Sequence, residues 1–341
     1  MLRNPQIPGA LVISLDLELH WGVRDRRPLD ANERTRLLSA RAAVLRIVEL
    51  FEEFSVRATW ATVGFLFARS REELAHFSPS VKAHYSDPAL DPYREQTGRD
   101  ESDDPFHFAP GLIGAIAVHT SQEIATHSFS HFYCCEPGQG PEEFKADLRS
   151  ALAIARYSGH HIRSYVFPRN QVNRDYLPIL KRAGLSAYRG TQSSAVNRAA
   201  AFRIQRRIHR RMLRLCDNYI DLYGPQTIPW PQGSEPYCIG ASRYLRPCSP
   251  LLSGLESLRR RRIAVAMQSA AERGELFHLW WHPEDYAGDC DSNLQFLRRV
   301  LVDYDRCRRE WGMLSLSMGE AARFACEDSA PVPANAMKEA I

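Results

Sequence analysis

The sequence contains no long hydrophobic run and no paired-cysteine motif, and these absences exclude several classes of protein. No stretch approaches the roughly 18 uninterrupted apolar residues that a transmembrane helix needs. The first apolar run, ALVISL at 10–15, is also too short for a signal peptide. The eight cysteines include no CxxC pair, so we expect free thiols rather than a disulfide framework or a zinc ribbon. The chain is therefore predicted to be cytoplasmic and to lack a transmembrane segment.

An excess of charge of one sign is also missing. The 44 Lys and Arg residues against 40 Asp and Glu leave a formal net charge of only +4, which is too mild to predict nucleic-acid binding. Arginine is nevertheless concentrated in two predicted helices, over Arg203–Arg214 and Arg259–Arg262. These runs are either solvated helix faces or contacts for a phosphate-bearing substrate or an anionic membrane surface.

Strand-like and helix-like patterns alternate along most of the chain. Short apolar runs indicate buried strands, and apolar residues spaced three and four apart indicate amphipathic helices between them. This alternation predicts parallel strands in an α/β architecture. The polar segment 70–112 is expected to be a long loop with short helices, residues 1–326 a single domain, and residues 327–341 a disordered tail. Strands are predicted at 9–15, 122–126, 162–167, 185–190 and 276–283, a strand leading into a helix at 56–67 and 313–325, and helices at 37–54, 141–157, 176–183, 199–216, 255–273 and 292–311.

Two acids follow the first predicted strand. Asp16 and Glu18 are two residues apart, so their side chains project to the same side of an extended chain. Carboxylates at the end of an apolar strand are costly to bury without partners. Taken alone, the pair is equally well explained as a helix N-cap followed by an exposed acid.

Two histidines follow the predicted strand at 122–126. His127 and His131 are four residues apart, so a helical turn would place both imidazoles on one face, where they can bind one ion. An isolated HxxxH pair is weak evidence, and the alternative is two solvent-facing or core histidines. Together with Asp16 and Glu18, however, the histidines form a mixed nitrogen and oxygen ligand set that suits zinc, with one carboxylate left over as a base.

Two further residues at predicted strand ends suit amide hydrolysis. An amine leaves poorly unless it is protonated, and His282 is a suitable acid for that step. Arg169 follows Pro168, so its backbone N–H could stabilise an oxyanion while its guanidinium orients the spare carboxylate. The alternatives are a packed core histidine and a surface arginine. The residues expected to bind the substrate are His20, Trp21, Asn170, Trp280 and Trp281, although most tryptophans are simply part of a core.

Four segments in a fixed order resemble the motifs of the polysaccharide deacetylase family, the NodB-homology carbohydrate esterases. They are ISLDLE at 13–18, THSFSH at 126–131, VFPRNQ at 166–171 and HLWWHP at 278–283, with TWATVG at 59–64 also in a matching place. The resemblance covers about residues 10–320. It implies a distorted (β/α)7 barrel, a single domain with loop insertions, and a metal site at the carboxyl ends of the strands, where barrel enzymes have their active sites.

The resemblance also implies a role for each site residue. Asp16 would be the general base, His127 and His131 metal ligands, and His282 the general acid, while Arg169 would supply an oxyanion N–H. The family's second aspartate is replaced by Leu17, which cannot bind a metal. Glu18 is therefore expected to be the third ligand, with Asp16 as the alternative.

These features together predict a metal-dependent, most simply zinc-dependent, N-deacetylase. The DLE-type first motif resembles the branch found in surface-polysaccharide (O-antigen or lipopolysaccharide-like) biosynthesis. The expected substrate is an amino sugar, either free or linked to a nucleotide or a lipid pyrophosphate. Two alternatives remain open: an amide hydrolase of other specificity, such as a deformylase or an enzyme for a non-sugar amide, and a catalytically silent sugar-binding relative. Nothing in the sequence indicates an oligomeric state.

Overall fold

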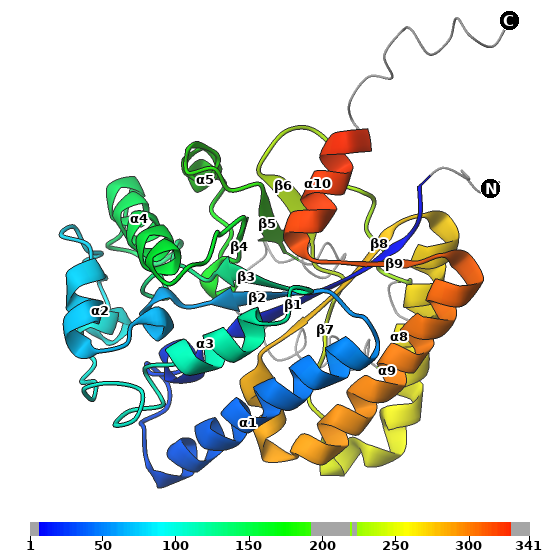
Figure 1. Ribbon diagram of the computed structural model, residues 1–341, viewed down its shortest axis with the longest axis horizontal. Helices are drawn as coiled ribbons and strands as arrows, with labels where there is room; N and C mark the ends of the chain where they lie inside the picture. Colours follow the sequence, from blue (N-terminus) through cyan, green and yellow to red (C-terminus); the bar gives the residue numbers. More distant parts are fainter. Residues whose placement is uncertain (1–6, 192–218, 220–223, 329–341) are drawn as a thin grey trace, which may run out of the picture.

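The computed structural model describes residues 7–191, 219 and 224–328 (Figure 1). The basic helix predicted at 199–216 and the tail from 329 onward lie outside these residues. Helix α10 (Met318–Asp328) shows that residues 327 and 328, assigned to the tail from the sequence, are helical. No helix in the described ranges is long and apolar enough to cross a bilayer. The seven cysteines in these ranges are free thiols, as predicted.

The described residues form a nine-stranded sheet in which every pairing between strands is parallel. The strand order is β6-β5-β4-β3-β2-β1-β8-β7, and β9 pairs with β1. The predicted strand at 162–167 is shorter than expected, because only Ser164 and Tyr165 pair with neighbours. The strands are β1 (Ala10–Leu17), β2 (Ala58–Thr62), β3 (Gln122–Thr126), β4 (Ser164–Tyr165), β5 (Ala187–Gly190), β6 (Tyr237–Gly240), β7 (Arg243–Tyr244), β8 (Leu276–Trp281) and β9 (Leu314–Leu316).

The segment 237–244 joins the two edges of this sheet. Its first half, β6, pairs with β5, and its second half, β7, pairs with β8. Between them, the N–H of Ala241 donates to the carbonyl of Gly190 at 3.3 Å and the N–H of Ser242 donates to the carbonyl of His278 at 2.9 Å. The sheet therefore curls into the distorted (β/α)7 barrel expected from the sequence, since β1 to β5, the β6–β7 segment and β8 occupy seven positions.

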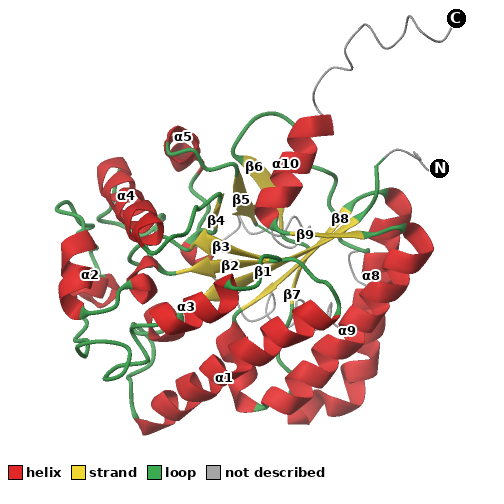
Figure 2. Cartoon of the chain, in the orientation of Figure 1, coloured by secondary structure: helices red, strands yellow, loops and turns green. Residues whose placement is uncertain are grey.

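Helices surround the sheet, and the strands run through the middle of the molecule (Figure 2). The helix α1 begins at Ala31, earlier than predicted, because the Asp30 side chain caps it by accepting from the N–H of Glu33 at 2.8 Å. The segment predicted as a loop with short helices contains α2, two 3-10 turns and the start of α3. The helices are α1 (Ala31–Glu53), α2 (Arg71–Phe77), α3 (Pro110–Ala117), α4 (Pro141–Tyr157), α5 (Leu177–Arg182), α8 (Glu256–Arg273), α9 (Cys290–Trp311) and α10 (Met318–Asp328).

Helix α8 carries the arginine run at 259–262, which is not simply a solvated face. Arg259 is buried, pairs with Glu256 and lies 3.8 Å from the centroid of the Phe296 ring. Arg262 is buried as well and donates to the carbonyl of Gly224 at 2.5 Å. At these two positions the solvated-face interpretation is wrong, because the charged groups are used in packing between elements.

The two ends of the barrel interior differ in polarity. At the amino ends of the strands, Met318 and Ala321 of α10 belong to an apolar cluster with Ala10, Val12 and Leu276. β1 is buried along its whole length, as expected for a parallel strand covered on both faces. Towards the carboxyl ends the interior becomes polar, and the predicted site residues are found there.

Candidate active site

Glu18 lies immediately after β1 and is held in place through its backbone. Strand alternation directs Ser14, Asp16 and Glu18 to the same side. The buried side chain of Glu284 accepts from the N–H groups of Glu18 at 3.0 Å and Leu19 at 2.6 Å. Leu19 has a φ of 47°, so the chain turns sharply at this point. The turn ends the strand and leaves the Glu18 carboxylate above the barrel interior.

The two histidines are positioned by a loop rather than by the helical turn considered from the sequence. His127 is the first residue after β3, and both Ser128 (φ 63°) and His131 (φ 56°) have left-handed backbone conformations. The carboxylate of Asp147, from α4, accepts from the N–H groups of Phe129 at 2.8 Å and Ser130 at 3.0 Å. Burial raises the pKa of Asp147 to about 6, although these hydrogen bonds oppose the shift. A buried carboxylate distant in sequence thus fixes the loop.

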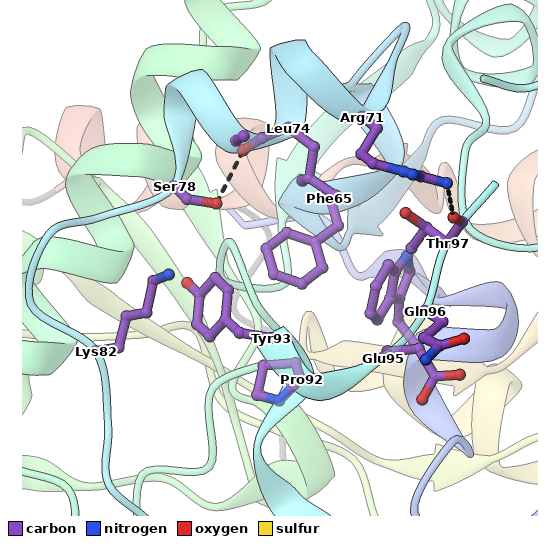
Figure 3. Close-up of a pocket in the computed structure, with 12 residues that line it drawn as sticks. Phe65, Arg71, Leu74, Ser78, Lys82, Pro92, Tyr93, Glu95, Gln96 and Thr97 are labelled. Carbon is purple, nitrogen blue, oxygen red and sulfur yellow. Dashed lines mark hydrogen bonds between the residues drawn. The ribbon is translucent and has the colours of Figure 1, made fainter. Parts of the chain in front are cut away.

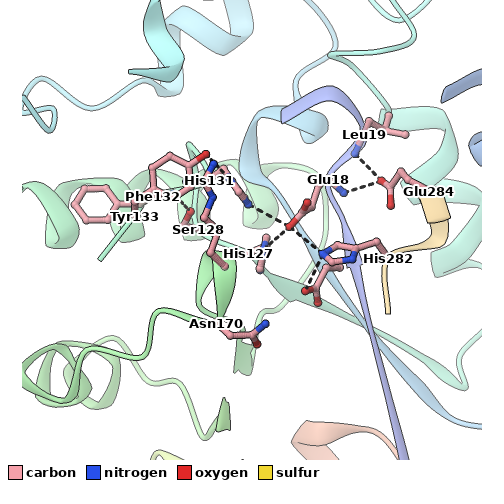
Figure 4. A network of polar contacts seen from close by, with 12 residues as sticks. Glu18, Leu19, His127, Ser128, His131, Phe132, Tyr133, Asn170, His282 and Glu284 are labelled. Carbon is pink, nitrogen blue, oxygen red and sulfur yellow. Dashed lines mark hydrogen bonds and ion pairs between the residues drawn. The ribbon is translucent and has the colours of Figure 1, made fainter. Parts of the chain in front are cut away.

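Glu18 and the two histidines converge on one point (Figure 4). The Oε1 atom of Glu18 lies 2.8 Å from Nε2 of His127 and 3.1 Å from Nε2 of His131. All three side chains are buried. Burial alone would raise the pKa of Glu18, but the charges of His131 and His282 and the hydrogen bonds from both loop histidines hold it well below its usual value.

These three side chains fit a divalent ion. One donor atom from each lies within 4.8 Å of the other two. Two imidazole nitrogens and one carboxylate oxygen form a common three-ligand set for zinc with an open coordination position. The sequence left Asp16 open as the third ligand, but the geometry favours Glu18, because Asp16 is engaged elsewhere.

Asp16 is paired with Arg189, a residue that the sequence analysis missed. The Asp16 carboxylate accepts two hydrogen bonds of 2.6 Å from the Arg189 guanidinium, and both side chains are buried. Oδ1 of Asn170 accepts from Nη2 of Arg189 at 3.0 Å, and the guanidinium lies 4.5 Å from the centroid of the Trp280 ring. Such a bidentate pair fixes the plane of the carboxylate.

Further buried hydrogen bonds, made by Ser14 and His278, hold the Arg189 side chain in place. The hydroxyl oxygen of Ser14 accepts from Arg189 at 3.1 Å and lies 2.8 Å from Nε2 of His278. The other ring nitrogen of His278 lies 2.9 Å from the carbonyl of Gly240. Burial, with a smaller contribution from Arg189, lowers the pKa of His278 to about 3. His278 is therefore neutral, and through Ser14 it helps to fix the position of Arg189.

Arg169 does not orient the spare carboxylate, so this part of the prediction is wrong. Its guanidinium pairs with Asp25 and lies 4.2 Å from the centroid of the Tyr133 ring. Arg169 and Asn170 both have left-handed backbone conformations, with φ of 54° and 53°. The backbone N–H of Arg169 has no hydrogen-bond partner among the residues that the structure describes. The role predicted for this N–H remains a prediction.

His282 follows β8 and faces both acids. Its Nε2 lies 3.7 Å from Oδ2 of Asp16 and 3.8 Å from Oε1 of Glu18, while Nδ1 lies 3.3 Å from Oδ2 of Asp285. Burial by itself lowers the pKa of His282, but the negative charge of Glu18 and the hydrogen bond to Asp285 outweigh it and raise the pKa to about 10. Tyr244 also donates to Asp285. Neither Asp285 nor Tyr244 was singled out from the sequence.

The residues predicted to bind the substrate separate into two groups. Asn170 and Trp280 lie beside the Asp16–Arg189 pair. Trp21 and Trp281 are buried, and neither lines the active-site cavity. Trp281 points to the opposite face of β8 from Trp280 and packs against Phe51, whereas Trp21 donates to the carbonyl of His107 at 3.0 Å. His20 is also buried and lies against His107 rather than in the site.

Comparisons with known proteins agree with this architecture. No family model matches the sequence, and a search of the curated proteins finds no match. Among solved structures, a protein from Mycobacterium smegmatis assigned as a polysaccharide deacetylase is similar over 97% of both chains, with a TM-score of 0.60 and 13% identity. The allantoinase PuuE gives a TM-score of 0.56 at 13% identity over 97% of this chain and 96% of its own.

A third structure, from Pseudomonas aeruginosa PAO1, is also assigned as a polysaccharide deacetylase. It gives a TM-score of 0.56 at 11% identity and covers 95% of this chain and 92% of its own. The chain has the polysaccharide deacetylase fold. At these identities the likeness establishes the fold alone.

In this polysaccharide deacetylase fold the site opens through a cavity of about 420 Å³ at the carboxyl ends of the strands. That is the end at which barrels of this kind carry their active sites. Acidic groups line its base, and arginines line its rim. The cavity is bounded by Asp16, Glu18, His131, Asn170, Tyr244, His282, Glu284 and Asp285 and by the arginines Arg26, Arg27, Arg36 and Arg169.

Proposed function

We propose that this chain is a metal-dependent hydrolase that removes an acyl group from the nitrogen of an amino sugar. The observation that carries the proposal is the convergence of Glu18, His127 and His131 on one point, with Asp16 and His282 on the open side of the same cavity. These elements are a candidate ion site, a base and an acid, which are the parts that hydrolysis of an unactivated amide requires.

Glu18, His127 and His131 would hold the divalent ion, and their donor set fits zinc. When bound, such an ion lowers the pKa of a coordinated water toward ~7 and polarises the substrate carbonyl. The protein's contribution is a buried and rigid ligand set. Glu284 holds the Glu18 backbone, and Asp147 holds the histidine loop.

Asp16 acts as the general base. Each carboxylate oxygen has two lone pairs, so the bidentate contact with Arg189 leaves acceptor capacity on the side that faces the cavity. Arg189 keeps the carboxylate in one plane and offsets its charge in a buried place. Asp16 therefore takes the proton from the attacking water in a fixed direction.

His282 acts as the general acid. Asp285 accepts from Nδ1, so the Nε2–H points into the cavity towards the leaving nitrogen. The charge of Glu18 and the hydrogen bond to Asp285 raise the pKa of His282, which favours the protonated imidazole that a general acid requires. The backbone N–H of Arg169, whose donor has no partner in the described chain, stabilises the oxyanion.

The rim of the cavity favours an anionic substrate. Arg26 and Arg27 have side chains that are 62% and 57% exposed, and they share two acidic partners, Asp25 and Glu33, with Arg169 and Arg36. Four guanidinium groups against two carboxylates leave net positive charge at the entrance. An amino sugar carried on a nucleotide or a lipid pyrophosphate would complement this charge. Surface-polysaccharide biosynthesis is a pathway that uses substrates of this kind.

A second candidate is hydrolysis of a non-sugar amide. The structure of PuuE, named an allantoinase, covers nearly the whole chain at a TM-score similar to those of the deacetylase structures. The acid, base and ion site would serve any amide of suitable size. A different acyl group, such as formyl, is compatible with the same reaction for the same reason.

The proposal is tested by measuring metal content together with acyl release. The purified chain is incubated with nucleotide-linked N-acetyl and N-formyl amino sugars, and released acetate and formate are quantified. We expect His127→Ala to lose bound metal and activity together, and His282→Ala to lose turnover while keeping its metal. The control His119→Ala, a change on the surface, keeps both. Full activity in His127→Ala would contradict the proposal, and absence of metal from the wild type would favour a silent sugar-binding relative.

A further inference from the structure

A second cluster of metal-binding side chains lies next to the candidate active site but is not part of it. His20, His107 and Glu95 each offer one donor atom, and these atoms lie within 4.8 Å of one another. Nε2 of His107 is 3.8 Å and Nε2 of His20 is 4.0 Å from Oε1 of Glu95. The cluster joins the turn after β1 to the long segment between α2 and α3.

Among the residues that the structure describes, no hydrogen bond joins His20, His107 and Glu95 to one another. The distances to Glu95 exceed the range of a hydrogen bond. Both histidines are 1% exposed, and Nε2 of His107 and Nδ1 of His20 have no hydrogen-bond partner among the described residues. Buried polar atoms without partners are rare and indicate a missing water or ion. Here the unpartnered Nε2 of His107 points towards a carboxylate and a second imidazole.

A carboxylate orients the ring of His107. Oδ2 of Asp104 lies 2.7 Å from Nδ1 of His107, and the same carboxylate accepts from the N–H of Gly98 at 2.7 Å. A carboxylate that accepts from one ring nitrogen places the lone pair on the other, which is how metal-bound histidines are usually oriented. The lone pair of Nε2 is thereby directed into the cluster.

The cluster is also accessible from solvent. The Glu95 side chain is 28% exposed. It lines a cavity of about 490 Å³ next to Tyr93, Gln96 and Thr97 (Figure 3). An ion can therefore reach the two buried histidines from the Glu95 side without passing through the active-site cavity.

We propose that His20, His107 and Glu95 form a second divalent-metal site of the zinc class. Two imidazoles and one carboxylate are suitable ligands for zinc, whose bonds of roughly 2 Å would span the gaps between these donors. Asp104 is a positioning residue that acts through His107. The ion would be bound by Glu95 and His107 from the segment 88–109 and by His20 from the turn after Glu18. It would therefore stabilise the active site without taking part in the reaction. This inference does not depend on the proposed function.

The test is a count of zinc ions bound per chain. The full-length protein is stripped of metal, titrated with Zn²⁺, and analysed for metal after removal of free ion. We expect two ions in the wild type, one in His107→Ala and one in His127→Ala. Glu95→Gln, a conservative change at a partly exposed position, should weaken one of the two sites by more than about 100-fold, and Asp104→Asn by about 10- to 100-fold. The control His76→Ala, on the exposed face of α2, should keep two.

Each outcome separates this site from the active site. A wild type that binds at most one ion, lost in His127→Ala, would overturn the second site and leave only a water in the cluster. Retention of two ions by both His107→Ala and Glu95→Gln would overturn it as well. One ion that is lost in His107→Ala but kept in His127→Ala would support the second site and contradict the proposed function.

Discussion

The two ends of the barrel interior differ in the polarity of the side chains that they bury. The amino end is closed by α10, whose Met318 and Ala321 pack against the first residues of β1 and β8. The carboxyl end instead buries a carboxylate, a guanidinium and several histidines in one hydrogen-bonded group. Apolar burial stabilises a fold, whereas buried ion pairs contribute little net stability but hold side chains in one geometry. Stability and chemistry are therefore separated along the barrel axis.

The largest effect should come from the polar end. We expect Asp16→Asn to lower kcat/KM by about 10²- to 10⁴-fold, because the general base is lost. Bound metal should stay near the wild-type level, since Asp16 is not among the proposed ligands. Steady-state kinetics and metal analysis check both points. Asp303→Asn is the matched control, because Asp303 is also a buried acid that pairs with an arginine but does not line the cavity. A comparable loss in Asp303→Asn would show that the effect of Asp16→Asn is not specific to a general base.

A change at the apolar end should show the opposite pattern. Met318→Ala removes a fully buried side chain and leaves a cavity, so we expect a loss of about 2–5 kcal/mol in the free energy of unfolding. The kcat of the folded protein and its metal content should be unchanged. Chemical denaturation combined with kinetics well below the transition measures both. A large fall in kcat without loss of stability would mean that the two ends are coupled.

The smallest effect concerns the polar layer between the two ends. The folded pKa of His278, about 3, lies below the ordinary value of 6.5. The unfolded chain therefore binds more protons between these values, and the stability due to neutral His278 is lost as the pH falls from 6.5 towards 3. Between pH 6.5 and pH 5 the free energy of unfolding should fall by an amount on the order of 2 kcal/mol.

In His278→Gln this part of the pH dependence should disappear. The measurement is the difference in unfolding free energy between the variant and the wild type at pH 6.5 and pH 5. A difference that does not change with pH would mean that His278 is not held neutral by its surroundings.

Much of this arrangement can be predicted from the sequence because it is local. Asp16 and Glu18 follow one strand, and His127 and His131 follow another. Parallel strands bring their carboxyl ends to one edge, so the pattern predicts both the barrel and the region of the site. Strand alternation also predicts that the side chains of Trp280 and Trp281 point to opposite faces of the strand. The prediction that both contact a substrate did not take this alternation into account.

The parts that could not be predicted depend on contacts between distant segments. Arg189 stands in the unremarkable strand AYRG, and its contact with Asp16 exists only because of how β5 and β1 face each other across the barrel. Asp147 and Glu284 act on backbone N–H groups far away in the sequence. Trp21 gives no periodic signal, because it lies in a 3-10 turn whose orientation is set by packing against His107 and Phe65.

The closure of the barrel through residues 237–244 has a consequence for how the chain tolerates change. The gap between β6 and β7 is only two residues long, and each of these residues is hydrogen-bonded to a different edge of the sheet. An insertion between Ala241 and Ser242 would separate those edges and expose two rows of unpaired backbone groups, a known route to self-association. Lengthening this short link would therefore turn a closed sheet into an aggregation-prone one.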